Sequence, residues 1–216
     1  LSGDRKDARV KKFIAQAEAA GTRMLNSDSD KLDALVGTRR HQGVVAKVDA
    51  TRRDIKLADV LDSLEENALI LVLDGVQDPH NLGACLRVAD AAGAHAVVAP
   101  RDRAVGLNAT AIKVASGAAD TVPYITVTNL ARALREMQEA GVWVVGAAGD
   151  ATKSVHDIDQ KVPLAWVLGA EGDGLRRLTR ETCDELARIP MYGSVDSLNV
   201  SVASGICLFE ARRQRA

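Results

Sequence analysis

The sequence is poor in aromatic residues, because phenylalanine, tryptophan and tyrosine together make up only 3% of its 216 residues. A folded core must therefore be built largely from aliphatic side chains and alanine. No apolar run reaches about 18 residues, so we expect no transmembrane helix. The first residues, Leu1 to Lys6, contain neither a hydrophobic signal core nor an initiator methionine. We expect further residues in front of them.

Cysteine is scarce as well. Cys85, Cys183 and Cys207 are far apart in the sequence and odd in number, which argues against a disulfide framework. No cluster of histidine and cysteine has the spacing of metal ligands, so we expect no metal site. Unpaired cysteines are typical of proteins of the reducing cytoplasm, where we place this chain.

The net charge of −1 conceals an uneven distribution. Residues 1–53 carry 12 lysines and arginines against 7 aspartates and glutamates, which gives +5, and the remaining residues carry 16 against 22, which gives −6. A basic front on an acidic body favours a polyanionic partner. A solvated basic helix would produce the same charge, and both interpretations stay open at this point.

Residues 1–48 have the pattern of a small α/β unit. Hydrophobic spacing predicts a helix over residues 4–20, a second helix over 31–36 capped by the Ser/Asp run before it, and a strand over 44–48. Residues 49–66 are strongly charged. We expect them to form a linker with a short helix near residues 57–64.

From Leu69 onward, short apolar runs alternate with helical patterns. Continuous apolar runs are typical of strands that are buried on both faces. The alternation predicts a mostly parallel α/β sheet with helices on both faces. The expected strands cover residues 69–73, 96–99, 142–146, 164–168 and 187–190, with a short segment at 122–127, and the expected helices cover 82–92, 109–115, 131–140, 175–186 and 200–213.

Ligands bind beyond the carboxyl ends of the strands in such a sheet. Three segments with unusual polar residues leave strands there: residues 78–83 followed by Arg87, the glycine loop 169–174, and residues 191–199. Glycines allow positive φ angles and a close approach of backbone to a ligand. A glycine-rich loop alone is usually only a turn, but three such segments at one edge predict a binding site.

Arg87 follows Cys85 and Leu86 in an apolar stretch, and we expect its guanidinium to seek a bidentate acceptor. Glu171 is the protein group best suited to that role. A structural pair that joins two loops and a catalytic arrangement are both compatible with this pattern. Ser197 and Asn199 precede a predicted helix, so either is also a simple N-cap.

Three motifs in order resemble those of the SpoU (TrmH) family of RNA 2′-O-methyltransferases, over roughly residues 67–216. They are Asn81-x-Gly83 with Arg87, then Leu168-Gly169-x-Glu171-Gly172-x-Gly174, then Ile189-Pro190-Met191 with Ser197-Leu198-Asn199. Upstream, His41-Gln42-Gly43-Val44 resembles the end of the small ribosomal-protein-like RNA-binding domain of some members. The resemblance implies that residues 1–48 are part of such a domain and that 67–216 form the methyltransferase domain.

The resemblance implies a fold that general rules would not predict, a deep trefoil knot formed by the C-terminal segment. It implies that S-adenosylmethionine binds in the knot, with Gly169, Ile189 and Leu198 lining its pocket. It also implies a homodimer with the last helix in the interface. The whole pattern is similar to members that methylate the ribose 2′-hydroxyl of a guanosine in 23S ribosomal RNA.

The family assigns the activating role to the counterpart of Arg87. An arginine is a poor proton acceptor, since its pKa exceeds about 12. We therefore expect Arg87 to stabilise the forming alkoxide electrostatically, with Asn81 and Glu171 orienting it. Ser197 and Asn199 are expected to fix the loop and the ribose.

Two other functions compete with this hypothesis. One is a tRNA ribose 2′-O-methyltransferase of the same family, and the other is a non-catalytic rRNA-binding protein of ribosome assembly. Without the resemblance, a nucleotide-binding Rossmann enzyme would be the prediction. The absence of a G-x-G-x-x-G motif after the strand at 69–73 disfavours that prediction.

Overall fold

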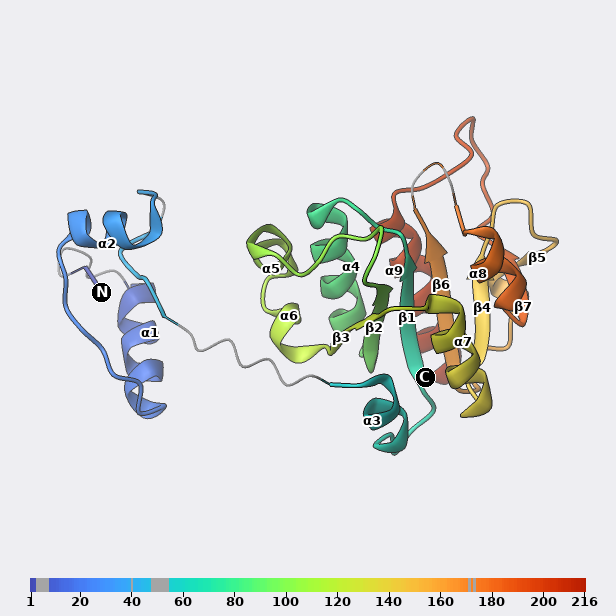
Figure 1. Cartoon of the computed structure of the whole chain (residues 1–216), viewed down its shortest axis with the longest axis horizontal. Coiled ribbons are helices and arrows are strands. Elements are labelled where there is room, and N and C mark those ends of the chain that lie inside the picture. Colours follow the sequence, from blue (N-terminus) through green and yellow to red (C-terminus); the bar gives the residue numbers. More distant parts are fainter. Residues whose placement is uncertain (3–7, 40, 48–54, 171, 173) are drawn as a thin grey trace. The chain divides into compact units, whose positions relative to one another are not determined.

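The computed structural model describes residues 1–2, 8–39, 41–47, 55–170, 172 and 174–216. The chain divides into two compact units, Leu1–Arg53 and Asp54–Ala216 (Figure 1). Over the described ranges, none of the helices has both the length and the apolar character needed to cross a membrane.

The first unit contains helices α1 (Ala8–Ala19) and α2 (Ser29–Val36). The predicted cap of α2 is confirmed, because the Asp28 carboxylate accepts the backbone N–H of Lys31 at 2.9 Å. The strand predicted over residues 44–48 is wrong for residues 44–47, which form no strand. In the described part of this unit the only β pairing is an isolated bridge between Ser2 and Ser27, so those residues have no ladder to join. Residues 4–7 of the predicted first helix, and Val48, lie outside the described residues.

The second unit is built on a seven-stranded sheet in which every described pairing is parallel. This confirms the predicted α/β sheet. The strand order is β3-β2-β1-β6-β4-β7-β5. The strands are β1 (Leu69–Asp74), β2 (Ala96–Pro100), β3 (Tyr124–Val127), β4 (Trp143–Ala147), β5 (Lys153–Ser154), β6 (Leu164–Gly169) and β7 (Glu185–Arg188).

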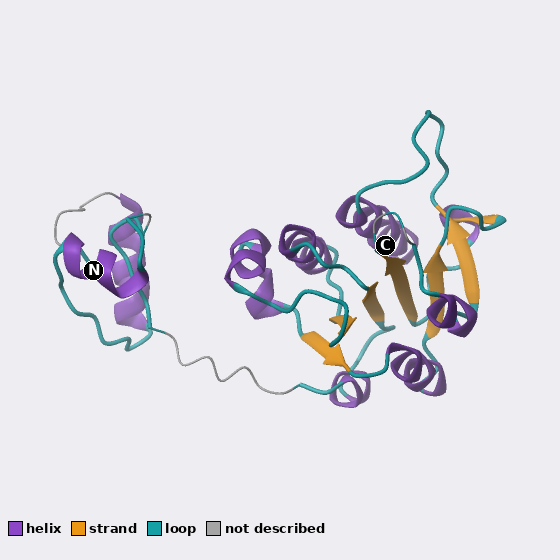
Figure 2. Ribbon diagram, turned by 45° about the horizontal axis from the view of Figure 1, so that its top comes forward, coloured by secondary structure: helices purple, strands orange, loops and turns teal. Residues whose placement is uncertain are grey.

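Helices cover both faces of this sheet (Figure 2). One face carries α4 (Pro79–Ala91), α5 (Ala109–Ala115), α6 (Ala118–Thr121) and α9 (Val200–Arg215), and the other carries α3 (Leu57–Asp62) and α7 (Leu130–Glu139). A 3-10 turn, η1 (Val155–Asp157), follows β5. Successive side chains of β1 point to opposite faces of the sheet, and both faces are buried, which explains its continuous apolar run. Leu69 and Leu71 face the first core, while Ile70 and Val72 face the second.

The described core is largely aliphatic, as the low aromatic content predicts. The exception is Trp166, which is fully buried in the centre of the sheet. Its indole N–H donates to the side-chain oxygen of Gln160 at 3.0 Å, and Gln160 is itself fully buried. The buried polar atoms of this pair are therefore satisfied.

Several element boundaries differ from the prediction, among them the strand predicted over 187–190, which is β7 over Glu185–Arg188. Helix α4 begins at Pro79, three residues early, because Asp78 caps it and proline is favoured in the first turn. The helix predicted over 175–186 is wrong beyond Thr182, since α8 (Arg177–Thr182) gives way to β7. The reason is tertiary: Asp184 exchanges hydrogen bonds with the Val144 backbone and starts a strand beside β4.

Candidate active site

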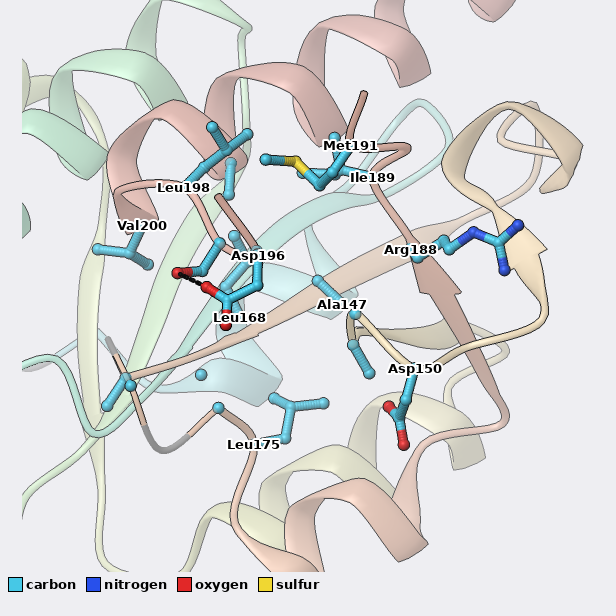
Figure 3. Close-up of a pocket in the computed structure, with 18 of the residues that line it drawn as sticks. Ala147, Asp150, Leu168, Leu175, Arg188, Ile189, Met191, Asp196, Leu198 and Val200 are labelled. Carbon is cyan, nitrogen blue, oxygen red and sulfur yellow. Dashed lines mark hydrogen bonds between the residues drawn. The ribbon is translucent and has the colours of Figure 1, made fainter. Parts of the chain in front are cut away.

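A cavity of about 810 Å³ opens at the carboxyl ends of β4, β6 and β7 (Figure 3). Described residues of three segments line it, together with Arg180: residues within 147–150 at the end of β4, within 168–175 at the end of β6, and within 188–203 between β7 and the first turn of α9. The carboxyl edge of a parallel sheet is where ligands bind in open α/β folds. The structure therefore joins two of the three predicted segments in one site.

The glycine loop forms one wall of the cavity. The Gly174 N–H donates to the Ala170 carbonyl at 3.0 Å, which folds the loop back on the end of β6. A Cβ at Gly169 would lie 2.0 Å from the carbonyl carbon of Gly174, so no side chain fits there. Gly172 and Gly174 have φ angles of 84° and 66°, in the region that favours glycine. Glu171, which precedes Gly172, is outside the described residues.

An ion pair with a buried carboxylate, which the sequence analysis missed, holds the glycine loop on the sheet. The Asp74 side chain is fully buried at the end of β1, where it pairs in register with Gly169. Its carboxylate accepts the backbone N–H of Arg176 at 2.9 Å and the Nε–H of the same residue at 2.5 Å. The available signal was an aspartate that ends an apolar run, since a buried charge requires a partner.

The first and third motifs also meet. Asn199 caps α9 by accepting the Ser201 N–H at 2.9 Å, and its amide N–H donates to the Asn81 side-chain oxygen at 2.8 Å. Asn81 lies in the first turn of α4. Ser197 lines the cavity, where its hydroxyl donates to Asp196 at 3.2 Å (Figure 3).

Arg87 does not have the apolar setting that its neighbours suggest. Cys85 and Leu86 are buried, but the helical period turns Arg87 to an exposed position. Arg87 and Asn81 are not among the residues that line the cavity. In the part of the chain that the structure describes, no hydrogen bond or ion pair involves the Arg87 guanidinium. The expected contact with Glu171 falls outside that part.

The cavity walls combine apolar and charged side chains, and Asp150 and Arg188 lie apart from Asp196 (Figure 3). Gly169, Ile189 and Leu198 all line it, as do Met191 and Val200. Asp150 and Arg180, which the sequence analysis did not identify, line it too and form a bidentate pair with distances of 2.9 and 3.0 Å. Hydrogen bonding from Arg180 lowers the pKa of the Asp150 carboxyl. A cavity that combines apolar walls with polar groups is suited to a small organic molecule.

The polar groups do not assemble a metal centre over the described ranges. No set of three or more histidine, cysteine, aspartate or glutamate side chains is placed there to hold an ion.

Two family models match the chain. The SpoU rRNA Methylase family matches residues 68–209. A model described as RNA 2′-O ribose methyltransferase substrate binding matches residues 1–53.

Individual proteins are similar over most of the chain. The 23S rRNA (guanosine-2′-O-)-methyltransferase RlmB of Ralstonia nicotianae is 64% identical over 216 residues, which is all of this chain and 87% of the relative. The crystal structure of an AdoMet-bound rRNA methyltransferase from Sinorhizobium meliloti is 27% identical with a TM-score of 0.75, and the match covers 96% of this chain and 78% of that one. The SpoU methyltransferase AviRb from Streptomyces viridochromogenes, in complex with AdoMet, shares the fold with a TM-score of 0.78 at 24% identity, over 98% and 80% of the two chains.

Proposed function

The chain belongs to the SpoU rRNA methylase family, and we propose from this premise that it methylates the ribose 2′-hydroxyl of a guanosine in 23S ribosomal RNA. The methyl donor is S-adenosylmethionine. The observation that carries the proposal is the 64% identity, over the whole chain, to a relative named for this reaction. A tRNA substrate and a non-catalytic role are not favoured, because that relative is named a methyltransferase of 23S rRNA.

The cavity fits the cofactor. Its volume of about 810 Å³ is within the range of small-molecule sites, about 300–1,000 Å³. Gly169, whose missing Cβ lets the backbone of Gly174 pack against it, lines the cavity, while Ile189 and Leu198 supply apolar walls. These three residues are our candidates for holding S-adenosylmethionine, which supplies an electrophilic methyl group when bound.

The chain's own residues must deal with the charge that develops on the ribose oxygen. We assign Arg87 to stabilise the forming alkoxide, because a guanidinium beside the ribose oxygen favours negative charge more strongly in the transition state than in the ground state. Asn81 and Asn199, joined by a hydrogen bond, link the helix of Arg87 to the cavity wall. Glu171 orients Arg87. Ser197 and Asn199 fix the loop and the ribose. An RNA phosphate accepts the proton that the 2′-hydroxyl loses.

The Arg87→Ala variant tests this assignment. Removing one donor to a developing oxyanion costs about 10²–10³-fold in rate, so we expect kcat for radiolabelled methyl transfer to 23S rRNA to fall by about 100-fold. Cofactor affinity, measured by calorimetry, is expected to stay unchanged. Arg132→Ala, which removes an exposed arginine of α7, is the matched control. Near-normal turnover of Arg87→Ala would contradict the assignment.

We further propose that different parts of the chain have different roles. Residues 1–48 act as a part of an RNA-binding domain, residues 49–66 link it to the catalytic part, and residues 67–216 form the methyltransferase domain. The net charge of +5 over residues 1–53 and the substrate-binding model over the same residues support an RNA-binding role. We place the protein in the cytoplasm with its ribosomal RNA substrate.

The C-terminal segment is proposed to form the deep trefoil knot of the family. Residues 188–203 line the cavity opposite the glycine loop, and α9 then packs on α4, β1 and β6. This arrangement brings the last part of the chain back against its first strand. Such a knot is rare among folds. Its presence would make cofactor binding depend on the integrity of α9.

We also propose a homodimer that uses α9. Val202 and Phe209 are each 50% exposed and lie seven residues apart, on one side of the helix. Gly205 lies between them, and a Cβ there would meet only Val88, at an ordinary 3.7 Å. Packing within one protomer therefore does not require this glycine. A helix of a second copy that packs closely against this position would require a residue without a side chain.

A further inference from the structure

The segment that joins β2 to α5, residues 101–108, carries two exposed arginines on either side of the exposed Asp102, and we call it the basic loop. Arg101 and Arg103 are both exposed, and over the described ranges no ion pair joins either of them to a carboxylate. By contrast, Arg177, Arg180 and Arg213 each pair with an acid. Arg132 and Arg135 on α7 are also exposed and, over the described ranges, form no ion pair, so the position of Arg101 and Arg103 in the fold, rather than the lack of a partner, carries the inference.

The basic loop lies at the edge of the sheet where the cavity opens. Strand β2 pairs in parallel with β1, so the end of β2 at Pro100 lies beside the end of β1. The Arg101 N–H donates to the Val127 carbonyl at 2.8 Å, which ties the start of the loop to β3. Both arginines therefore emerge at the carboxyl ends of the strands, the same edge as the candidate active site.

Contacts with the β1–α4 segment hold the loop in place. The Val105 N–H donates to the Val76 carbonyl at 2.9 Å, and the Tyr124 hydroxyl donates to the Val105 carbonyl at 3.1 Å. Arg103 has a φ of 59°, which is unfavourable for a residue with a side chain and persists only where neighbours impose it. The Val76 segment leads directly into α4, so the backbone that carries the arginines is held relative to the first motif.

Helix α5, which follows the basic loop, also lies close to the first motif. Helix α5 packs against α4 (Figure 1), and a Cβ at Gly83 would lie 2.5 Å from the Ala111 carbonyl oxygen. Lys113, on α5, is a third exposed cation in this region. The basic loop and α5 thus form a rigid cationic border beside Asn81 and the helix that carries Arg87.

We infer that Arg101 and Arg103 bind backbone phosphates of the ribosomal RNA that flank the nucleotide presented to the candidate active site. The inference rests on the proposed function. A guanidinium presents two parallel donors that match a phosphate, and phosphate contacts set register and orientation without reading sequence. The second unit then has an RNA contact of its own, in addition to residues 1–53.

The double variant Arg101→Ala/Arg103→Ala tests the inference, with a 23S rRNA transcript as the probe. Each lost phosphate contact lowers the slope of log K against log salt concentration by about 0.7 to 0.9. We therefore expect filter binding between about 50 and 200 mM salt, a range over which such contacts are sensitive, to give a slope about 1.4 to 1.8 smaller. The KM for RNA should rise at least about tenfold. At saturating RNA, kcat and the KM for S-adenosylmethionine should be unchanged, which also verifies folding.

Arg132→Ala/Arg135→Ala is the charge-matched control. Both residues are exposed on α7, on the other face of the sheet, so this pair should leave the salt slope and both KM values unchanged. Arg101→Lys/Arg103→Lys keeps the charge and should restore most of the slope. An unchanged slope in the alanine variant, or an equal loss in the α7 control, overturns the inference. Failure of the wild-type protein to methylate the transcript would instead contradict the proposed function, while the binding measurements still decide the role of the two arginines.

Discussion

At the scale of single residues, the glycine loop depends on positions where a side chain cannot fit. Gly169 ends β6, and its missing Cβ leaves room for the backbone of Gly174 and Leu175. Asp74 fixes the residue that follows the loop, since it accepts two N–H groups of Arg176 while fully buried. The loop is therefore preorganised by one steric condition and one ion pair.

Gly169→Ala is expected to weaken cofactor binding, because it displaces the glycine loop that lines the cavity. The new methyl group would lie 2.0 Å from the Gly174 carbonyl carbon, and moving a packed backbone to relieve overpacking costs about 1–3 kcal/mol. Affinity for S-adenosylmethionine, measured by calorimetry, should fall at least about tenfold, which corresponds to about 1.4 kcal/mol.

The control for this change is Gly106→Ala. Gly106 has no heavy atom of the described structure within 4 Å of an added Cβ, and its φ is not in the positive region. The affinity of this variant for the cofactor should equal that of the wild type. Unchanged affinity in Gly169→Ala would mean that the cofactor does not bind against this loop.

At the scale of elements, α9 is the last helix of the second unit, and its end is bonded to several other segments. Its C-terminal arginines donate to backbone carbonyls of other segments. Arg212 contacts the Ala92 and Gly93 carbonyls, and Arg215 contacts those of Ala68 and Val162 among others. Side chains at the end of α9 are thereby tied to the amino ends of β1 and β6, which keeps its other end, at Asn199, beside the cavity.

Glu210 makes the stability of this helix depend on pH. Hydrogen bonds from Arg213, with smaller contributions from Gln214 and His156, hold the pKa of Glu210 at about 2, below its ordinary 4.5. The residue is 7% exposed. Because the folded-state pKa is lowered, the stabilisation is fully present above pH 4.5 and is lost as the pH falls from 4.5 to about 2.

Glu210→Gln should therefore lower the free energy of unfolding by roughly 1–2 kcal/mol at pH 7, since hydrogen bonds to a charged group are lost while Arg213 is largely solvated. The difference from the wild type should shrink through the same acidic range. Urea titrations followed by tryptophan fluorescence at about pH 7, 4 and 3 measure it. Glu139→Gln, at an exposed position of α7, is the control. A difference that is independent of pH would contradict an origin in the Glu210 carboxylate charge.

At the scale of the whole molecule, the chain combines a basic unit and an acidic one. Residues 1–53 carry +5, while the second unit holds the cavity and carries −6. The acidic unit still presents cations at the edge where RNA would arrive, at Arg101 and Arg103. On the proposed function, substrate binding would be shared between the units, and the second unit would orient the RNA at the site.

The proposed homodimer is tested by Phe209→Asp. Burying a carboxylate in an apolar interface is strongly unfavourable, so we expect sedimentation equilibrium to show a dimer for the wild type and mainly monomer for the variant. Leu178→Asp is the matched control, because Leu178 is 49% exposed but lies on α8. A monomeric wild type, or a variant that remains dimeric, would contradict the proposed interface.

The sequence by itself determined the local structure of the second unit and the position of most of its site. Apolar runs and caps depend on residues a few positions apart, so β1, α5 and the N-cap Asn199 could be predicted. The same reasoning located the glycine loop, and the family resemblance placed Gly169, Ile189 and Leu198 at one site. Local reasoning failed where an element depends on a distant partner: residues 44–47 found no strand to pair with, and Asp184 ended α8 early by bonding to Val144.

Only the tertiary structure decided which side chains meet and which way they face. Asp74 and Arg176 are 102 residues apart, and Asn81 and Asn199 are 118 apart, so no local pattern could pair them. Arg87 was expected among apolar neighbours, but the packing of α4 buries Cys85 and Leu86 and leaves Arg87 exposed. The physical reason is that a periodic pattern specifies the face of each element, whereas the contact between two faces depends on how the whole chain packs.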